Sequence, residues 1–110
     1  MKYVQLHIAV KDWQIIDAVI DNSIAVDVVE GEVVTAMRGS VVRDAGWPAS
    51  FHKGGDRFEY GWQPGNVILE IEVSGDHWAF VLEQLERWRQ VDDTPGLAAV
   101  TAKVRSALNS

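Results

Sequence analysis

Two segments of the chain alternate apolar and polar residues, which is the pattern of a strand with one buried face. The first runs from Lys2 to Val10 and the second from Val67 to Val73. The positions expected to face the core are Val4, Leu6, Ile8 and Val10 in the first strand and Val67, Leu69, Ile71 and Val73 in the second. Because Glu70 and Glu72 occupy the opposite face of the second strand, we expect that face to meet solvent or a partner.

Two other segments repeat apolar residues every three or four positions, as an amphipathic helix does. Asp12 is expected to cap a helix that ends near residue 22, and Asp76 is expected to cap a helix that ends near residue 91. Glu83 and Arg87 are four residues apart on the exposed side of the second helix, which predicts an ion pair between them.

The last segment admits two interpretations. Thr94-Pro95 is a signal for the start of a helix, and apolar residues between Leu97 and Leu108 fall on one helical face. The strict alternation from Ala98 to Val104 also fits a strand. We favour the helix.

The centre of the chain predicts further strands. From Ile24 to Val29 the apolar residues return to a period of two, and Glu30-Gly31 follows as a turn. The segments Glu32 to Met37 and Val41 to Arg43 are expected to continue as strands, with a break at Gly39-Ser40 between them.

A long excursion runs from Asp44 to Gln63, with several glycines, a proline and an aromatic content that is unusual for a loop. Its aromatic residues are Trp47, Phe51, Phe58, Tyr60 and Trp62. Residues 57–62 alternate like a strand, and Gln63-Pro64-Gly65-Asn66 has proline and glycine where a type II turn requires them. The pattern therefore predicts a hairpin into the strand that starts at Val67.

The order of predicted elements is strand, helix, strand, excursion, strand, helix and a final element, which is typical of an α+β ferredoxin-like fold. We expect an antiparallel sheet with two helices on one face, a long aromatic loop or hairpin at its edge, and a C-terminal helix. The chain has 110 residues, no internal repeat and no linker-like stretch, so a single domain over residues 1–110 is expected.

In layout, this arrangement resembles the PII-like signalling proteins, which have a long loop after their second strand. The resemblance rests on residues 2–10, 13–20, 24–31, 38–66, 67–73 and 78–88. It implies a trimer that binds nucleotides or other small anions between its subunits. The glycine motif with which that family contacts nucleotides is absent from Asp92 to Leu97, where only Gly96 is present. No binding residue is therefore carried over from the family.

Charge and composition narrow the classes of function. The formal net charge of −6 argues against general nucleic-acid binding, which requires a basic face to neutralise phosphate. The absence of cysteine excludes disulfides, thiolate metal sites and a thiol nucleophile, and it fits a reducing, cytoplasmic location. The strand pattern at the N-terminus differs from a signal peptide, and no apolar run reaches the ~18 residues of a membrane span.

The excursion carries the candidate binding residues. Between Arg38 and Arg57 four basic residues stand against two acidic ones, so this segment is locally +2 and the rest of the chain −8. Aromatic side chains are enriched at binding hot spots, and two of the tryptophans lie outside the predicted helices. We expect a partner or a small anion to contact Trp47, Phe51, His52, Lys53, Arg57, Tyr60 and Trp62. The alternative is that the charges are solvated and the aromatic residues form a small core within the loop.

A metal site on the sheet is a further hypothesis. His7 could share the outer face with Asp27, Glu70 and Glu72, and such a set could hold a divalent ion if the strand register brings its members together. Solvated or subunit-facing polar residues are the simpler explanation. We predict no metal site, no cofactor and no catalytic residue.

These observations favour a non-catalytic binding or regulatory module that acts through residues 47–62. Its expected partner is a protein or a small anionic ligand, and a homo-oligomer formed through the sheet would fit. A second hypothesis is an acidic inhibitor of the immunity or antitoxin kind, whose carboxylates neutralise a basic partner by charge complementarity. The third is a small enzyme that uses His52 with Asp56 or Glu59 for acid–base catalysis, although their spacing matches no catalytic motif.

Overall fold

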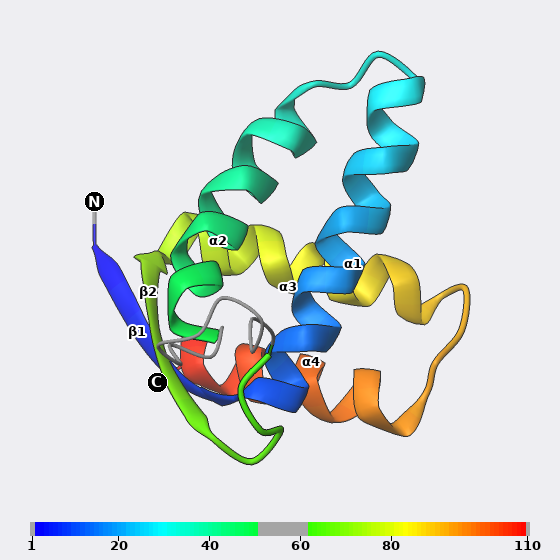
Figure 1. Cartoon of the computed structure of the whole chain (residues 1–110). Helices are drawn as coiled ribbons and strands as arrows, with labels where there is room; N and C mark the ends of the chain where they lie inside the picture. The colour runs from blue at the N-terminus through cyan, green and yellow to red at the C-terminus, as the bar shows by residue number, and fades with distance from the viewer. Residues whose placement is uncertain (1, 51–61, 110) are drawn as a thin grey trace.

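The computed structural model describes residues 2–50 and 62–109. These residues form one antiparallel sheet and four helices, which confirms the predicted α+β class. In chain order the elements are β1 (Tyr3–Ala9), α1 (Val10–Val29), α2 (Val34–Ser50), β2 (Ile68–Ser74), α3 (Gly75–Arg89) and α4 (Pro95–Leu108), as Figure 1 shows. Among these described residues, no helix combines the length and the apolar composition needed to cross a membrane.

The two strands are those expected from the alternating segments at the N-terminus and before the second helix pattern. They pair antiparallel, with Tyr3 opposite Ser74 at one end of the ladder and Ala9 opposite Ile68 at the other. The residues on the buried face are Leu6 and Ile8 in β1 and Leu69, Ile71 and Val73 in β2, as predicted. The opposite face of the sheet, which includes Glu70 and Glu72, is exposed.

The strands predicted between residues 24 and 43 are wrong, because this part of the chain forms a helical hairpin. Ile24–Val29 continues α1, and both Val34–Met37 and Val41–Arg43 belong to α2. The described residues therefore hold a two-stranded sheet, and the ferredoxin-like layout is not confirmed. Valine and isoleucine favour strands only weakly, because strand propensities of all residue types differ by no more than about 1 kcal/mol. The packing of α1 against α2 overrides this preference.

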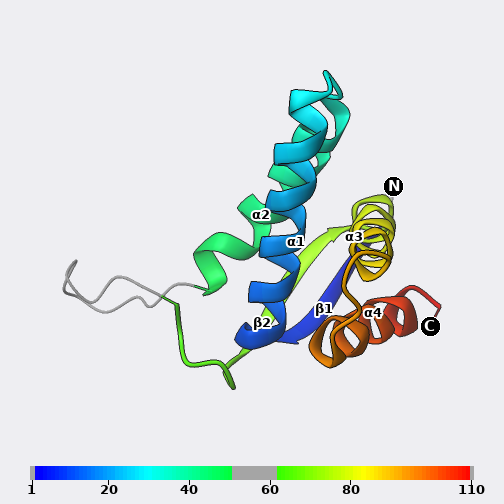
Figure 2. The ribbon, with the colours of Figure 1, turned by 90° about the vertical axis from the view of Figure 1, so that its right-hand side faces the viewer.

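The turn predicted at Glu30-Gly31 is confirmed, but it joins two helices. Gly31 has a φ of +84°, a left-handed conformation that is common just past the end of a helix. Two other glycines let the helices approach closely: a Cβ at Gly39 would lie 2.8 Å from Ile20 Cγ2, and one at Gly46 would lie 1.9 Å from Trp13 Cζ2. Figures 1 and 2 show that the turn end of the hairpin stands clear of the other elements.

Both of the predicted N-terminal caps are wrong, while both helices are confirmed. The cap residue of α1 is Ala9, and Asp12 lies in the first turn, where its Oδ2 accepts from Lys103 Nζ at 2.9 Å. The cap of α3 is Ser74, whose hydroxyl accepts a backbone N–H of the first turn. Asp76 also lies inside its first turn, where a carboxylate interacts favourably with the positive end of the helix dipole.

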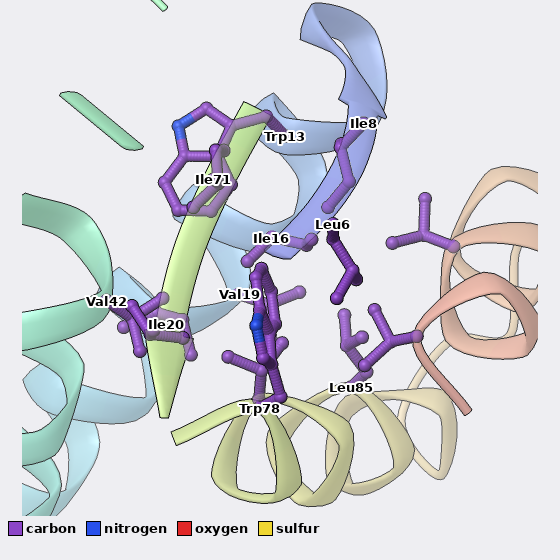
Figure 3. Close-up of a cluster of buried hydrophobic side chains, with 14 of the residues drawn as sticks. Leu6, Ile8, Trp13, Ile16, Val19, Ile20, Val42, Ile71, Trp78 and Leu85 are labelled. Carbon is purple, nitrogen blue, oxygen red and sulfur yellow. The ribbon is translucent and has the colours of Figure 1, made fainter. Parts of the chain in front are cut away.

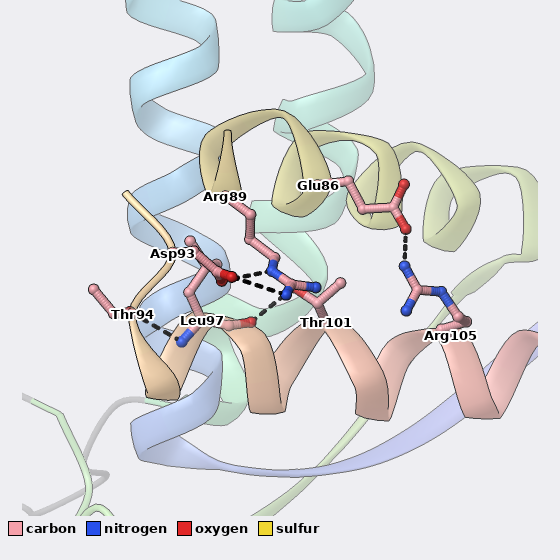
Figure 4. Close-up of polar contacts among 7 residues, drawn as sticks. All are labelled: Glu86, Arg89, Asp93, Thr94, Leu97, Thr101 and Arg105. Atoms are coloured by element: carbon pink, nitrogen blue, oxygen red, sulfur yellow. Dashed lines mark hydrogen bonds and ion pairs between the residues drawn. The ribbon is translucent and has the colours of Figure 1, made fainter. Parts of the chain in front are cut away.

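The C-terminal segment is the helix α4, which confirms the favoured interpretation. Thr94 caps it, since its hydroxyl accepts a backbone N–H of the first turn. Polar contacts link α3 to α4 and to the loop between them (Figure 4): Arg89 Nε lies 2.7 Å from Asp93 Oδ1, and Arg105 pairs with Glu86. These ion pairs are exposed, so each contributes little to the stability of the fold.

The core lies between the inner face of the sheet and the helices. Trp13 and Trp78 are its largest fully buried side chains. Figure 3 shows Trp13 projecting from α1 and Trp78 from α3 into the apolar cluster. The indole N–H of Trp78 donates to the carbonyl of Val4 at 2.8 Å, whereas the indole N–H of Trp13 has no hydrogen-bond partner among the described residues.

The type II turn predicted over Gln63–Asn66 is wrong. The hydrogen bond that closes the turn runs from the N–H of Val67 to the carbonyl of Pro64 at 3.0 Å, one residue further along the chain. Gly65 also lacks the positive φ that the third position of a type II turn requires. Most of the predicted aromatic hairpin falls in residues 51–61, outside the described residues.

Candidate functional site

α2 carries apolar residues on two opposite faces. The residues of its inner face, buried against the rest of the fold, are Thr35, Gly39, Val42 and Gly46. Because a helix turns by about 100° per residue, Val34, Met37 and Val41 share the opposite face, where their exposed fractions are 44%, 68% and 46%. Val33 precedes the helix, and its carbonyl accepts the N–H of Met37. Its side chain is exposed as well, so the outer apolar face extends to the turn.

Trp47, in the last turn of α2, is a further exposed apolar residue. At about 100° per residue it points about 80° away from Met37 and about 120° away from Val41, and it lines a hollow with Ser40, Arg43 and Asp44. Its ring meets that of Trp62 edge to face, with centroids 6.4 Å apart and an angle of 65° between the planes. The two indoles are 42% and 37% exposed. The exposed set Val33, Val34, Met37, Val41, Trp47 and Trp62 is called the α2 ridge below.

The structure brings together two of the seven predicted site residues, Trp47 and Trp62. The other five, Phe51, His52, Lys53, Arg57 and Tyr60, lie outside the described residues, as do Asp56 and Glu59 of the proposed catalytic set. The edge-to-face contact supports part of the alternative in which the aromatic residues form a small core. It covers each ring only in part, however, so both tryptophans still offer apolar surface to a partner.

The segment predicted to be basic is partly neutralised within the fold. Arg43 Nε lies 2.9 Å from Asp17 Oδ1, and its Nη1 lies 3.0 Å from Asp21 Oδ1. Burial acts to lower the pKa of Arg43, but the two carboxylates outweigh it and raise that pKa above its ordinary value. Arg38 is exposed and makes no ion pair with any described residue. It is therefore the one unpaired cation in the described part of this segment.

Acidic residues border the ridge. Glu30 and Glu32 lie at the turn of the hairpin, and Asp44 lies on the exposed side of α2. None of the three forms an ion pair within the described part of the chain. A hollow of about 230 Å³, lined by Ser40, Arg43, Asp44 and Trp47, opens beside the ridge. Around the ridge, the described residues therefore include more carboxylates without an ion-pair partner than cations without one.

Asp27 ties the far end of α1 to both neighbouring helices. Arg87 binds its carboxylate with two nitrogens, Nη2 to Oδ1 at 2.9 Å and Nη1 to Oδ2 at 3.1 Å. Thr35 Oγ1 donates to the same Oδ2 at 2.6 Å. The hydrogen bonds from Arg87 and then from Thr35 lower the pKa of Asp27 below its ordinary value of 3.8. The ion-pair partner of Arg87 is therefore Asp27, and the predicted pairing with Glu83 is wrong.

The ion pair of Asp27 with Arg87 makes the stability of the helical hairpin depend on pH. Because the pKa of this carboxyl is lower in the folded chain than in the unfolded one, its contribution is present above about pH 4 and is lost as the pH falls through the lowered pKa. Asp27→Asn should lower the unfolding temperature at neutral pH, and its difference from wild type should shrink towards zero in acid. Thermal unfolding from about pH 7 to about pH 2 measures this, with Asp44→Asn as the control. A difference that stays constant into acid would contradict it.

A groove of about 560 Å³ between α2 and α3 is the alternative place for a small ligand. Its charged lining consists of Asp27, Glu32, Arg38, Glu83 and Arg87. The guanidinium of Arg87 is already bound by Asp27, which leaves two acids against one arginine. This balance does not favour a small anion.

The four residues of the alternative metal-site hypothesis are not all brought together. His7 and Glu70 are cross-strand neighbours, and His7 Nε2 lies 3.4 Å from Glu70 Oε1. Glu72 is two residues further along β2, but Asp27 belongs to the helical hairpin. In the part of the chain that the structure describes, no group of three His, Asp or Glu side chains is placed to hold a metal ion. Polar residues on an exposed sheet face account for the cluster.

Comparison with known proteins finds no relative. No family model matches the chain, and neither does any curated protein or solved structure. The resemblance to the PII-like proteins stays a prediction, and the function has to be inferred from the surface of the molecule.

Proposed function

We propose that the protein is a non-catalytic binding module that recognises a partner protein through the α2 ridge. The observation that carries the proposal is the second apolar face of α2, which the described fold leaves exposed. Exposed apolar side chains that gather on one element are a feature of interaction sites. The Trp47–Trp62 pair adds the residue type most enriched at binding hot spots. The ridge includes Trp47 and Trp62, the two predicted binding residues of the 47–62 segment that the structure describes.

A rigid support favours binding through this face. Close contacts of Gly39 and Gly46 with α1 hold α2 in place, and so does the hydrogen bond from Thr35 of α2 to Asp27 of α1. A helix face that is ordered before binding loses less conformational entropy in the complex than a loop does. The ridge can therefore bind an apolar groove without first having to fold.

Charge indicates the chemistry of the partner. Glu30 and Glu32 lie at the turn end of the ridge and Asp44 lies on α2, and none of the three forms an ion pair with a described residue. The whole chain carries a net charge of −6. A partner with an apolar groove and a rim of Lys and Arg is the complementary surface, and its association should slow as salt rises. An acidic inhibitor that covers the basic functional site of such a partner is the second candidate, because the same acidic border favours it.

Replacing one residue at the centre of the ridge tests the proposal. Met37→Glu should weaken binding of the partner by about 100-fold, roughly 2.7 kcal/mol, because a carboxylate would have to be buried without a counter-ion. The partner is first sought by affinity capture from host extract with wild-type protein. The purified complex is then measured by titration calorimetry with wild type and variant.

The matched control is Ala102→Glu, which adds the same charge at an exposed position of α4. Both variants should keep the circular dichroism spectrum and unfolding temperature of the wild type, because neither position is buried. The proposal requires that a partner bind wild type and the control equally and bind Met37→Glu poorly. Equal affinity for all three proteins would remove the ridge from the interface.

A further inference from the structure

The outer edge of β1 carries backbone groups that no described residue bonds. In an antiparallel ladder, residues that bond to the opposite strand alternate with residues whose N–H and C=O point away from it. The N–H of Val10 donates to the carbonyl of Val67 at 2.9 Å, which extends the same register and fixes this alternation. By this alternation the residues of β1 that direct backbone groups to the free edge are Tyr3, Gln5, His7 and Ala9, the last of which is also the N-cap of α1. Figure 1 shows β1 as the outermost strand, with β2 between it and α2.

The residues of β1 themselves supply none of the devices that keep exposed strands apart. Proteins protect such edges with Lys, Pro, bulges or a covering element. The sequence of β1 is Tyr-Val-Gln-Leu-His-Ile-Ala, without a permanently charged residue, Pro or Gly, and its pairing with β2 runs without a bulge. The acids of the sheet, Glu70 and Glu72, both lie on β2.

We infer that β1 pairs antiparallel with β1 of a second copy of this chain, so that two sheets join into one of four strands. With Gln5 opposite itself at the two-fold axis, Tyr3 lies opposite the partner's His7. The N–H and C=O groups of these three residues in each chain then satisfy one another. In this register, residues whose N–H and C=O groups point to the free edge lie opposite one another in the two chains, as an antiparallel ladder with two-fold symmetry requires.

The side chains of β1 suit a second copy. On the outer face the pairs are Tyr3 with the partner's His7 and Gln5 with the partner's Gln5, so no two permanent charges of the same sign face each other. On the inner face Val4 comes opposite the partner's Leu6, which extends the apolar layer of each sheet across the join. The edge of β1 is thus self-complementary in its backbone hydrogen-bonding groups, in its charges and in its apolar side chains.

The dimer does not depend on the proposed function. The contact residues lie in β1, whereas the ridge lies on α2. If both hold, each dimer displays two ridges on one continuous sheet, and a partner with two sites is bound more tightly through effective concentration.

Charge substitutions at Gln5 test the inference. Gln5→Lys places two ammonium groups across the two-fold axis, but within one chain the new lysine lies opposite Glu72, an arrangement that favours the fold. Analytical ultracentrifugation from roughly 1 µM to 1 mM, where small interfaces dissociate, should show wild-type dimers and Gln5→Lys monomers. An equimolar mixture of Gln5→Lys with Gln5→Glu should restore a dimer that contains one chain of each.

The control is Ala102→Lys, which carries the same added charge on α4 and should dimerise like wild type. A wild-type protein that stays monomeric over the whole concentration range overturns the inference, as does a Gln5→Lys protein that dimerises like wild type. Neither result affects the ridge, because partner binding is measured separately with Met37→Glu. Protection of the Gln5 and His7 amides from hydrogen exchange, present in wild type and lost in Gln5→Lys, locates the dimer contact at this edge.

Discussion

Gly46→Ala is expected to destabilise the fold by about 3 kcal/mol, the upper part of the range for overpacked cores. Alanine is otherwise the better helix former by up to about 1 kcal/mol, so the sign of the change depends on the contact. The added Cβ would lie 1.9 Å from Cζ2 and 2.2 Å from Cε2 of Trp13, whose side chain is fully buried and cannot move aside. Urea unfolding, read as a shift of the midpoint at constant slope, measures the loss.

Two controls separate the clash from other effects of alanine. Gly75→Ala also places alanine in a helix, but there the nearest atoms lie 3.9 Å from the new Cβ, so stability should be unchanged or slightly higher. In a Trp13→Phe background, Gly46→Ala should be less harmful, because Cζ2 and Cη2 belong to the part of the two-ring indole that extends beyond a single phenyl ring. An equal loss in both backgrounds would show that Trp13 is not the obstacle.

Trp13→Ala is expected to lower the free energy of unfolding by about 4 kcal/mol, a large part of the roughly 5–15 kcal/mol of an ordinary domain. The side chain is fully buried where α1 and α2 approach most closely, so its removal leaves a cavity between elements that the glycines have already brought together. The loss is measured by urea unfolding monitored in the far ultraviolet. A variant within about 1 kcal/mol of wild type would contradict this packing.

Milder substitutions calibrate that result. Trp13→Phe keeps most of the apolar volume and removes an indole N–H that has no partner among the described residues, so it should be far less harmful than alanine. Trp47→Ala removes an indole that is 42% exposed, and it should cost less than half as much. Such a ranking identifies Trp13 as a core residue and Trp47 as a residue that contributes less to the stability of the fold.

The sequence predicts well those elements that have one apolar face. In β1 and β2 every second residue is apolar and the other positions are mostly polar, so only a strand buries the right set. α3 and α4 likewise have one apolar stripe each, and their caps, Ser74 and Thr94, precede the stripes. In these segments local pattern and tertiary burial agree, and the predictions were confirmed to within a few residues.

The helical hairpin could not be predicted by the same reasoning. In residues 24–43 both faces of the helices carry apolar residues, and a segment that is apolar on two sides has no helical period to detect. Valine and isoleucine at Ile24, Val26, Val28, Val33 and Val41 then favour strands on local grounds. The information that decides the fold lies in pairs far apart in sequence, such as Gly46 with Trp13 and Arg43 with Asp17.

The candidate site was predicted in part for a related reason. Its aromatic end was visible as Trp47 and Trp62, because tryptophan outside a helix stripe is unusual. The apolar centre of the ridge was missed, because Val33, Met37 and Val41 were assigned to strands. Placed at steps of about 100°, the segment from Val33 gives two apolar arcs, one buried and one exposed. A second apolar arc with no role in the fold is the signal that could have found the surface.

The most direct test of the α2 ridge is site-specific photocrosslinking in the host cell, with benzoylphenylalanine at position 37 in place of Met37. The same probe at position 102, in place of the exposed Ala102, is the reference. The account predicts a discrete covalent adduct with one partner protein at position 37 and none at position 102, and Val41→Glu in the same chain should abolish the adduct. Equal labelling from both positions, or none from position 37, would contradict the claim that this face of α2 is a binding surface.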